Sequence, residues 1–226
     1  MTYFDYSTAP YPIREDIANA HRTFWQKLAG PGSWWTGTER VAIARESRNA
    51  LTCAFCAERK QALSPYAVSG THTHDGGLPY RAIDAVHRII TDQNRLTQSF
   101  VDENDANGLS KAAYVELVGV VVAVFSIDEF HRALGLPIEA LPEASPGEPD
   151  RYTPAVLSDD IGFVPTIPPH GAVGKEADLC GAHASKFCAS LRGSGTAHRI
   201  VVGSEGTLTG TKKKKDGVVY TLKERF

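Results

Sequence analysis

The sequence lacks a long apolar run and lacks a strong excess of charge of either sign. Its longest apolar stretch, Leu117 to Phe125, is far shorter than the roughly 20 residues of a membrane-spanning helix, so we expect no membrane partner. The formal net charge of -2 provides no electrostatic reason to expect nucleic acid as a partner. No basic, apolar and small-residue succession opens the chain between Met1 and Asp16, so we expect no secretory signal. These absences favour a soluble, cytoplasmic protein.

Cysteine is also scarce, with 4 residues in 226. This number is too small for a scaffold held together by disulfides, and in a reducing compartment a Cys-x-x-Cys pair is more often catalytic or metal-binding. The chain has one such pair, Cys53 and Cys56. Cys180 and Cys188 lie much later in a stretch of different character, and we assign them no role.

The residues that are present predict helices. Apolar residues make up 42% and charged residues 22%, which is typical of a globular protein with a core. A first helix is expected from about Ile13 to Leu28, before the Gly-Pro-Gly breaker at 30–32. Thr36 and Glu39 form a capping box that predicts the start of a second helix. Further helices are expected from about Arg81 to Ile90, and from a Ser110 cap to Leu134.

The last of these helices is apolar on nearly every side, which predicts a central, buried helix. No alternation of strands and helices precedes Pro137, which argues against a thioredoxin fold. We therefore expect an all-α domain over residues 13–137. A proline-rich arm or linker is expected over 138–174, and a poorly structured extension of unknown fold over 175–226.

The Cys-x-x-Cys pair predicts a thiol redox centre. If Thr52 caps a helix, both Cys53 and Cys56 lie in its first turn, where unpaired backbone N–H groups favour the thiolate. Arg59 and Lys60, one turn further on, add positive charge. Oxidation of one sulfur to sulfenic acid would then let the other condense with it to a disulfide. The alternative is a pair of small buried apolar side chains.

A metal site is the second interpretation of the same pair. His72 and His74 follow on a loop between Leu63 and Tyr80 that is rich in Ser, Gly, Pro and His. Two cysteines and two histidines are a zinc ligand set, but histidines one residue apart do not match the usual gap of three to five residues. We therefore assign no metal ligand from the sequence.

Two carboxylates are candidates for proton transfer. Glu46 lies about two turns before Cys53 on the same side of the second helix if that helix runs straight, but not if Thr52 begins a new helix. Glu116 lies in the apolar middle of the longest helix, where a carboxylate must be paired or protonated. Arg48 is its expected partner, in a structural ion pair or a proton relay.

Two histidines receive weaker predictions. His131 is three residues after Asp128, so these two side chains can pair on one helix face. His87 lies beside Asp84 and Arg88 and is expected at the surface.

Together, residues Glu39 to Lys60, the Cys53–Cys56 pair and the helix from Tyr114 to Leu136 resemble the carboxymuconolactone decarboxylase/AhpD-like superfamily, in particular its alkylhydroperoxidase-related members. The resemblance covers about residues 13–137. It implies an all-helical, homo-oligomeric enzyme without a cofactor that reduces small alkyl hydroperoxides in antioxidant defence. A dithiol reductant would regenerate the pair, with Cys56 attacking the peroxide and Cys53 resolving it.

The chain departs from the pattern of that family at both proton-relay positions. The position of the family's glutamate falls on Val41, so Glu39 or Glu46 would have to replace it. The position of the relay histidine is Lys60, so either Lys60 holds the thiolate electrostatically or His72 or His74 moves the proton. The candidate catalytic residues are therefore Cys53, Cys56, Glu46, Glu39, Lys60, His72 and Glu116.

Two other functions stay open. The first is a non-catalytic helical oligomer whose cysteine pair binds zinc or senses redox state. The second is a decarboxylase or lactone-type activity, as in the other branch of the superfamily. The cysteines argue against it, because that branch does not depend on a thiol pair.

Overall fold

The computed structural model describes residues 3–159 and 162–168, and in these it contains six α-helices and no strand. The helices are α1 (Glu15–Ala29), α2 (Gly37–Asn49), α3 (Ala54–Gln61), α4 (Tyr80–Thr91), α5 (Gln98–Ala106) and α6 (Lys111–Ala133). Two 3₁₀ turns, η1 (Ala50–Thr52) and η2 (Gln93–Arg95), connect them. The predicted all-α class is confirmed. Helix α5 was not predicted as a separate helix.

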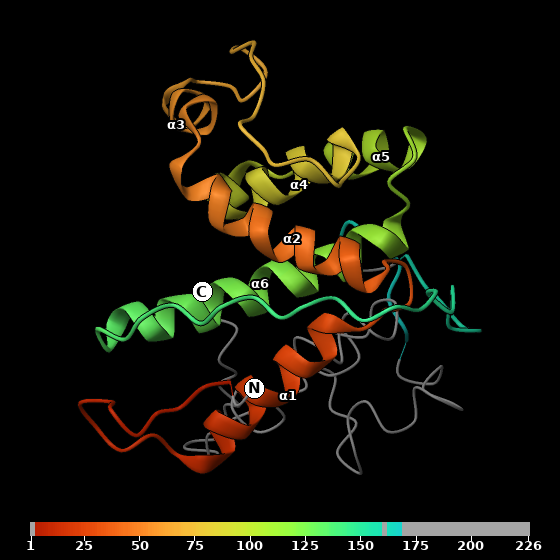
Figure 1. Ribbon diagram of the computed structural model, residues 1–226. Coiled ribbons are helices and arrows are strands. Elements are labelled where there is room, and N and C mark those ends of the chain that lie inside the picture. The colour runs from red at the N-terminus through yellow and green to blue at the C-terminus, as the bar shows by residue number, and fades with distance from the viewer. Residues whose placement is uncertain (1–2, 160–161, 169–226) are drawn as a thin grey trace, which may run out of the picture.

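Helix α6 is the central helix, as predicted. It crosses the middle of the domain between α1 on one side and α2 and α4 on the other (Figure 1). The side chains of Leu117, Val120, Val121 and Val124 are completely buried. Ser110 caps its first turn by accepting a hydrogen bond from the backbone N–H of Ala113. Among the described residues no single helix is long and apolar enough to span a membrane. Helices α5 and α6 taken together are long and apolar enough, but the pair is bent by 118° between the two helices.

The second predicted helix begins as expected. The Thr36 side chain accepts a hydrogen bond from the backbone N–H of Glu39, and the Glu39 carboxylate accepts one from the backbone N–H of Thr36. This reciprocal pair satisfies two N–H groups that would otherwise lack helical partners. The helix ends at Asn49, before the cysteines, and η1 redirects the chain into α3.

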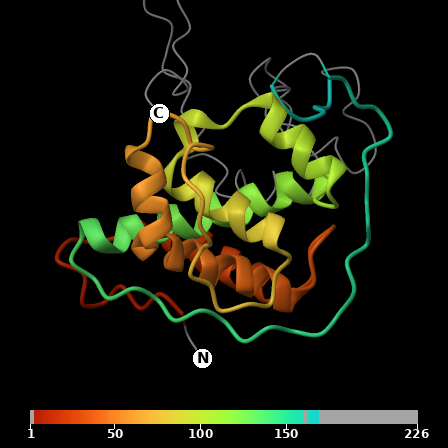
Figure 2. The ribbon, with the colours of Figure 1, turned by 90° about the horizontal axis from the view of Figure 1, so that it is seen from above.

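The arm after α6 packs against its own domain. Figure 2 shows it running along the outside of the helices. The Trp25 indole donates to the carbonyl of Ala140 at 2.7 Å, and the backbone N–H of Ser145 donates to the carbonyl of Ala29 at 2.8 Å. The described arm therefore covers α1 without forming a helix. The predicted extension at 175–226, with Cys180 and Cys188, lies outside the described residues.

The buried ion pairs differ from the predicted ones. Arg48 does not reach Glu116: it binds Asp128 through two hydrogen bonds of 2.8 Å. The partner of Glu116 is Arg40, at 3.4 Å, which lies about two turns before Arg48 on α2. Because Asp128 is occupied by Arg48, His131 turns instead to the hydroxyl of Tyr6 at 3.0 Å and the carbonyl of Pro137 at 2.6 Å.

Glu116 also fixes the loop before α2. Its carboxylate accepts a hydrogen bond of 2.7 Å from the backbone N–H of Trp34, and burial raises its pKa. The loop passes so close that a Cβ placed at Gly32 would lie 1.7 Å from the Glu116 Oε1 atom. Gly32 is therefore required by a close approach to a buried carboxylate. A proton-relay role for Glu116 has no support in this arrangement, because its carboxylate is used to hold the loop and Arg40.

We expect Gly32→Ala to lower the free energy of unfolding by about 1–3 kcal/mol, because the new methyl group must displace the buried Glu116 carboxylate. Urea unfolding followed by circular dichroism would measure the change. Gly30→Ala is the matched control, since a Cβ there meets its nearest neighbour only at 4.0 Å. Equal effects of the two substitutions would contradict this account of the loop.

Candidate functional site

The two cysteines lie at the start of α3, where the chain leaves η1. Cys53, in an extended conformation, is the residue that precedes the helix, and Cys56 lies in its first turn. The predicted cap, Thr52, instead ends η1 and donates its hydroxyl to the carbonyl of Asn49. The prediction of Thr52 as the cap was therefore wrong by one residue. Both sulfurs are free thiols and both residues are buried.

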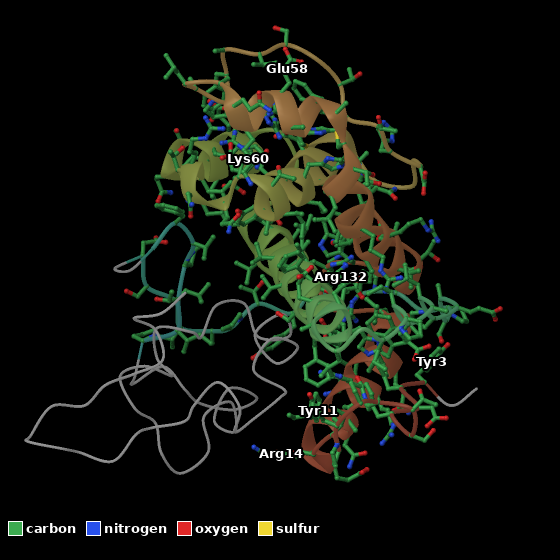
Figure 3. The ribbon with its side chains drawn as sticks, turned by 90° about the vertical axis from the view of Figure 1, so that its left-hand side faces the viewer. Tyr3, Tyr11, Arg14, Glu58, Lys60 and Arg132 are labelled. Carbon is green, nitrogen blue, oxygen red and sulfur yellow. The ribbon has the colours of Figure 1, made fainter. Side chains whose placement is uncertain are left out.

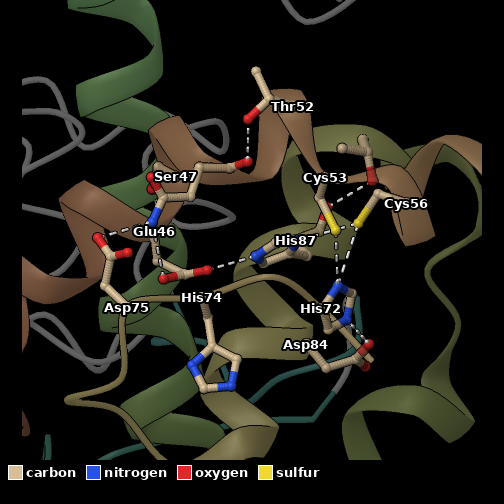
Figure 4. A network of polar contacts seen from close by, with 12 residues as sticks. Glu46, Ser47, Thr52, Cys53, Cys56, His72, His74, Asp75, Asp84 and His87 are labelled. Atoms are coloured by element: carbon tan, nitrogen blue, oxygen red, sulfur yellow. Dashed lines mark hydrogen bonds and ion pairs between the residues drawn. The ribbon is translucent and has the colours of Figure 1, made fainter. Parts of the chain in front are cut away.

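Two histidines point toward the sulfurs from other elements (Figure 4). His72, from the loop between α3 and α4, places its Nδ1 atom 3.4 Å from the Cys56 sulfur and 3.7 Å from the Cys53 sulfur. His87, from α4, places its Nδ1 atom 3.1 Å from the Cys56 sulfur. Four potential ligand atoms from three parts of the chain thus converge within 4.8 Å of one another.

Each histidine is held from behind by a carboxylate. The Nε2 atom of His72 lies 2.9 Å from Asp84, and the Nε2 atom of His87 lies 2.6 Å from Glu46. Each carboxylate accepts a hydrogen bond from the Nε2–H group, so in a neutral ring the Nδ1 lone pair faces the sulfurs. Arg59 donates to Asp84 at 2.7 Å and balances its charge. These contacts fix the orientation and the tautomer of both rings.

The cluster is closed to solvent. Cys53 is 4% exposed, Cys56 1%, His72 4% and His87 0%. Glu46 behind His87 is 2% exposed. The sequence-based expectation that His87 lies at the surface was wrong. Because the exchange of a ligand or a substrate requires access, a sealed arrangement of this kind favours a structural centre over an open catalytic one.

Protons are distributed unequally in the cluster. Burial raises the pKa of the Cys53 thiol, but the backbone N–H groups of Cys56 and Thr73 and the ring of His72 outweigh it and lower this pKa to about 7. Burial lowers the pKa of His72, but Asp84 and the two sulfurs raise it to about 9. Burial is the main cause that lowers the pKa of His87. His72 is therefore the protonated ring when no metal is bound, and His87 the neutral one.

The distances fit a single metal ion. A regular tetrahedron with Zn–S bonds of about 2.3 Å and Zn–N bonds of about 2.0 Å has ligand separations of about 3.3–3.8 Å. Three of the separations between sulfur and nitrogen atoms are 3.1, 3.4 and 3.7 Å, and all four potential ligand atoms lie within 4.8 Å of one another. Small side-chain movements would therefore bring the four atoms to the separations of a tetrahedral site. The carboxylates behind the rings match the usual partners of metal-bound histidines.

Four of the seven sequence-predicted site residues meet in this cluster: Cys53, Cys56, His72 and Glu46. The other three lie elsewhere. Glu39 belongs to the capping box of α2, Lys60 is exposed on α3 (Figure 3), and Glu116 holds the loop before α2. His74, the alternative relay, is exposed and accepts a hydrogen bond from the backbone N–H of Gly76.

His87 and Asp84 were not predicted as site residues. A signal for His87 was available, because it lies four residues after the buried Ile83 and one after the buried Val86, on the inner side of α4. Asp84 lies three residues before His87 and so faces the same region. The charged residues Asp84 and Arg88 close to His87 in the sequence suggested a solvent-exposed surface, whereas in the structure the Asp84 side chain is only 14% exposed and binds His72.

We expect Asp84→Asn to raise the pKa of the Cys53 thiol in the metal-free protein from about 7 toward the ordinary value of about 8.5. Without the Asp84 charge, His72 loses the partner that keeps it protonated, and the thiolate loses a cationic neighbour. The pH dependence of alkylation by iodoacetamide would measure this in a chain with Cys180 and Cys188 replaced by serine. Glu58→Gln, an exposed carboxylate on α3, is the control and should leave the midpoint unchanged.

Comparison of the chain with models of protein families found no match, and neither a curated protein nor a solved structure matches it. The resemblance to the AhpD-like superfamily therefore stays a prediction from the Cys-x-x-Cys segment and the two helices. What the protein does must be argued from the cluster of Cys53, Cys56, His72 and His87.

Proposed function

We propose that this chain is a metal-binding helical protein in which Cys53, Cys56, His72 and His87 hold one zinc ion. The observation that carries the proposal is the orientation of the histidines. Both rings direct Nδ1 at the thiols while both Nε2 atoms are held by carboxylates, Asp84 at 2.9 Å and Glu46 at 2.6 Å. The same arrangement orients metal-bound histidines generally.

The donor set selects the kind of metal. Two sulfurs and two imidazole nitrogens are soft or borderline ligands, which suit Zn²⁺ and do not suit Ca²⁺ or Mg²⁺. Four protein ligands in a sealed cluster leave no coordination position for water or substrate, which is the pattern of structural zinc. Two thiolates also neutralise the charge of the ion, so the bound centre carries no net charge into the interior.

A metal at this position would tie together three segments of the chain. Helix α3 spans only Ala54–Gln61, and isolated helices shorter than about 12 residues are marginal in water. The loop from Ala62 to Pro79 contributes His72 as its buried anchor. Zinc would connect this loop, α3 and α4, and its binding free energy would contribute directly to folding.

A thiol peroxidase is the second candidate function. It is supported by the two adjacent thiols and by the histidines with carboxylates behind them, which supply the parts of a proton relay. Its substrates would be small alkyl hydroperoxides, its electron donor a dithiol, and its assembly a homo-oligomer in the cytoplasm. The burial of both sulfurs weighs against rapid turnover, because peroxidatic cysteines are solvent-accessible. Continuous consumption of hydroperoxide by the metal-free protein, abolished by Cys56→Ser, would establish it.

We expect the protein purified from zinc-containing medium to carry about one zinc per chain, measured by elemental mass spectrometry. Cys53→Ser, Cys56→Ser, His72→Ala and His87→Ala should each lose most of the metal, because a structural zinc site needs all four ligands. His74→Ala is the matched control: it removes the neighbouring exposed histidine and should leave the zinc content unchanged. A metal-free wild-type protein that cannot be loaded with zinc would end the proposal.

We expect Glu46→Gln and Asp84→Asn to weaken zinc binding about 10–100-fold while leaving the four ligands in place. The reason is that each substitution removes the negative charge that makes the Nδ1 atom of the histidine in front of it a stronger ligand. Competition with a chromophoric chelator would measure the affinities. Glu58→Gln provides the control for the loss of one carboxylate near the site, and an equal loss of affinity in all three variants would refute the assigned role of Glu46 and Asp84.

A further inference from the structure

We propose that the zinc centre is also a redox switch: a hydroperoxide oxidises Cys53 and Cys56 to a disulfide, and the zinc ion leaves. This inference rests on the proposed zinc site and assigns to it a regulation. It is carried by the placement of the two sulfur ligands relative to each other and to the two nitrogen ligands.

The two sulfurs belong to one short segment, whereas the nitrogens come from elsewhere. Cys53 precedes α3 and Cys56 lies in its first turn, so both side chains start from adjacent points of one helix terminus. Both sulfurs approach the same His72 Nδ1 atom, at 3.7 and 3.4 Å. The two sulfurs lie within 4.8 Å of each other, so they have only a short distance to cover to form an S–S bond of about 2.0 Å. A disulfide bond would therefore remove two of the four proposed metal ligands.

The reaction balances with a hydroperoxide as the oxidant. One zinc-bound thiolate attacks an oxygen of the hydroperoxide, the O–O bond breaks, and the alkoxide takes a proton to become an alcohol. The sulfur is now a sulfenic acid. The second thiolate attacks it, the S–S bond forms, and hydroxide leaves and takes a proton to become water. In total, two thiolates lose two electrons, the hydroperoxide and two protons become alcohol and water, and Zn²⁺ is released.

The cluster lies just beneath the surface, because the chain segments next to it are exposed. In the chain, Cys53 stands between exposed Thr52 and exposed Ala54, and Leu51 before them is 45% exposed. The covering loop has no buried residue from Gln61 to Thr71. We therefore expect a small oxidant to reach the buried sulfurs slowly, through local opening of η1 or of this loop, whereas a protein-sized reactant would need a larger opening. Zinc keeps both sulfurs as thiolates, which are the reactive form.

The histidine half of the site would survive the oxidation. Contacts between each ring and its carboxylate, Asp84 for His72 and Glu46 for His87, do not involve the sulfurs. Arg59 continues to hold Asp84 from α3. Two preoriented nitrogens therefore remain in place, and reduction of the disulfide would restore all four ligands. The switch is reversible for this reason.

The experiment uses the full chain with Cys180 and Cys188 replaced by serine, loaded with zinc and titrated with tert-butyl hydroperoxide. A chromophoric chelator reports free zinc, and intact mass reports the state of the sulfurs. We expect one zinc released for each chain that loses two hydrogen atoms, about 2 Da, and recovery of the bound zinc after treatment with a dithiol and added zinc. The His74→Ala variant should behave in the same way.

The outcomes separate the two proposals. If the chain holds no zinc before oxidant is added, the zinc centre itself fails. If zinc is bound but stays bound while the mass is unchanged at excess hydroperoxide, the zinc centre stands and the switch is overturned. Release of zinc with addition of oxygen atoms to the cysteines, and without a disulfide that a dithiol reverses, also overturns the switch.

Discussion

The hydrogen bonds between Glu46 and His87 and between Asp84 and His72 are the contacts on which the site depends. An imidazole ring that is free to rotate can present either nitrogen, but a carboxylate behind Nε2 leaves only Nδ1 to face forward. The two rings come from α4 and from a loop, and each is brought to the thiols by this second contact. Without these two carboxylates the four potential ligands would be near one another but not oriented toward one point.

Helix α2 connects that site to the rest of the fold through buried polar side chains. Arg40 pairs with Glu116 on α6, Arg48 pairs with Asp128 on α6, and Glu46 holds His87 on α4. Each of these side chains would be costly to bury alone, so each pair specifies where α2 must lie relative to its neighbours. The apolar core around α6 buries the inner faces of the helices, and the polar pairs of α2 determine how α2 is aligned against α6 and α4.

Local signals in the sequence predicted the local features of the fold. The Thr36–Glu39 capping box, the Ser110 cap and the apolar length of α6 depend on neighbouring residues, so they could be identified directly. Partners that are distant in sequence could not be identified in this way. Arg48 was expected to pair with Glu116 because it lies on the apolar face of the second helix, but which arginine reaches Glu116 depends on how α2 packs against α6. The same limit explains the site, where Cys53 and Cys56 are three residues apart but His87 is 31 residues from Cys56.

The four proposed ligands nevertheless occur within one continuous stretch, from Cys53 to His87. The separations that must be closed between thiol and imidazole run from 16 residues (Cys56 to His72) to 34 residues (Cys53 to His87), and the free-energy cost of closing a loop rises only by about 0.6 kcal/mol for each doubling of its length. Neither α5 nor α6 contributes a ligand. The proposed centre would thus assemble during synthesis from residues that leave the ribosome before the central helix, so that α3, the loop and α4 would already be joined when α6 arrives to complete the core.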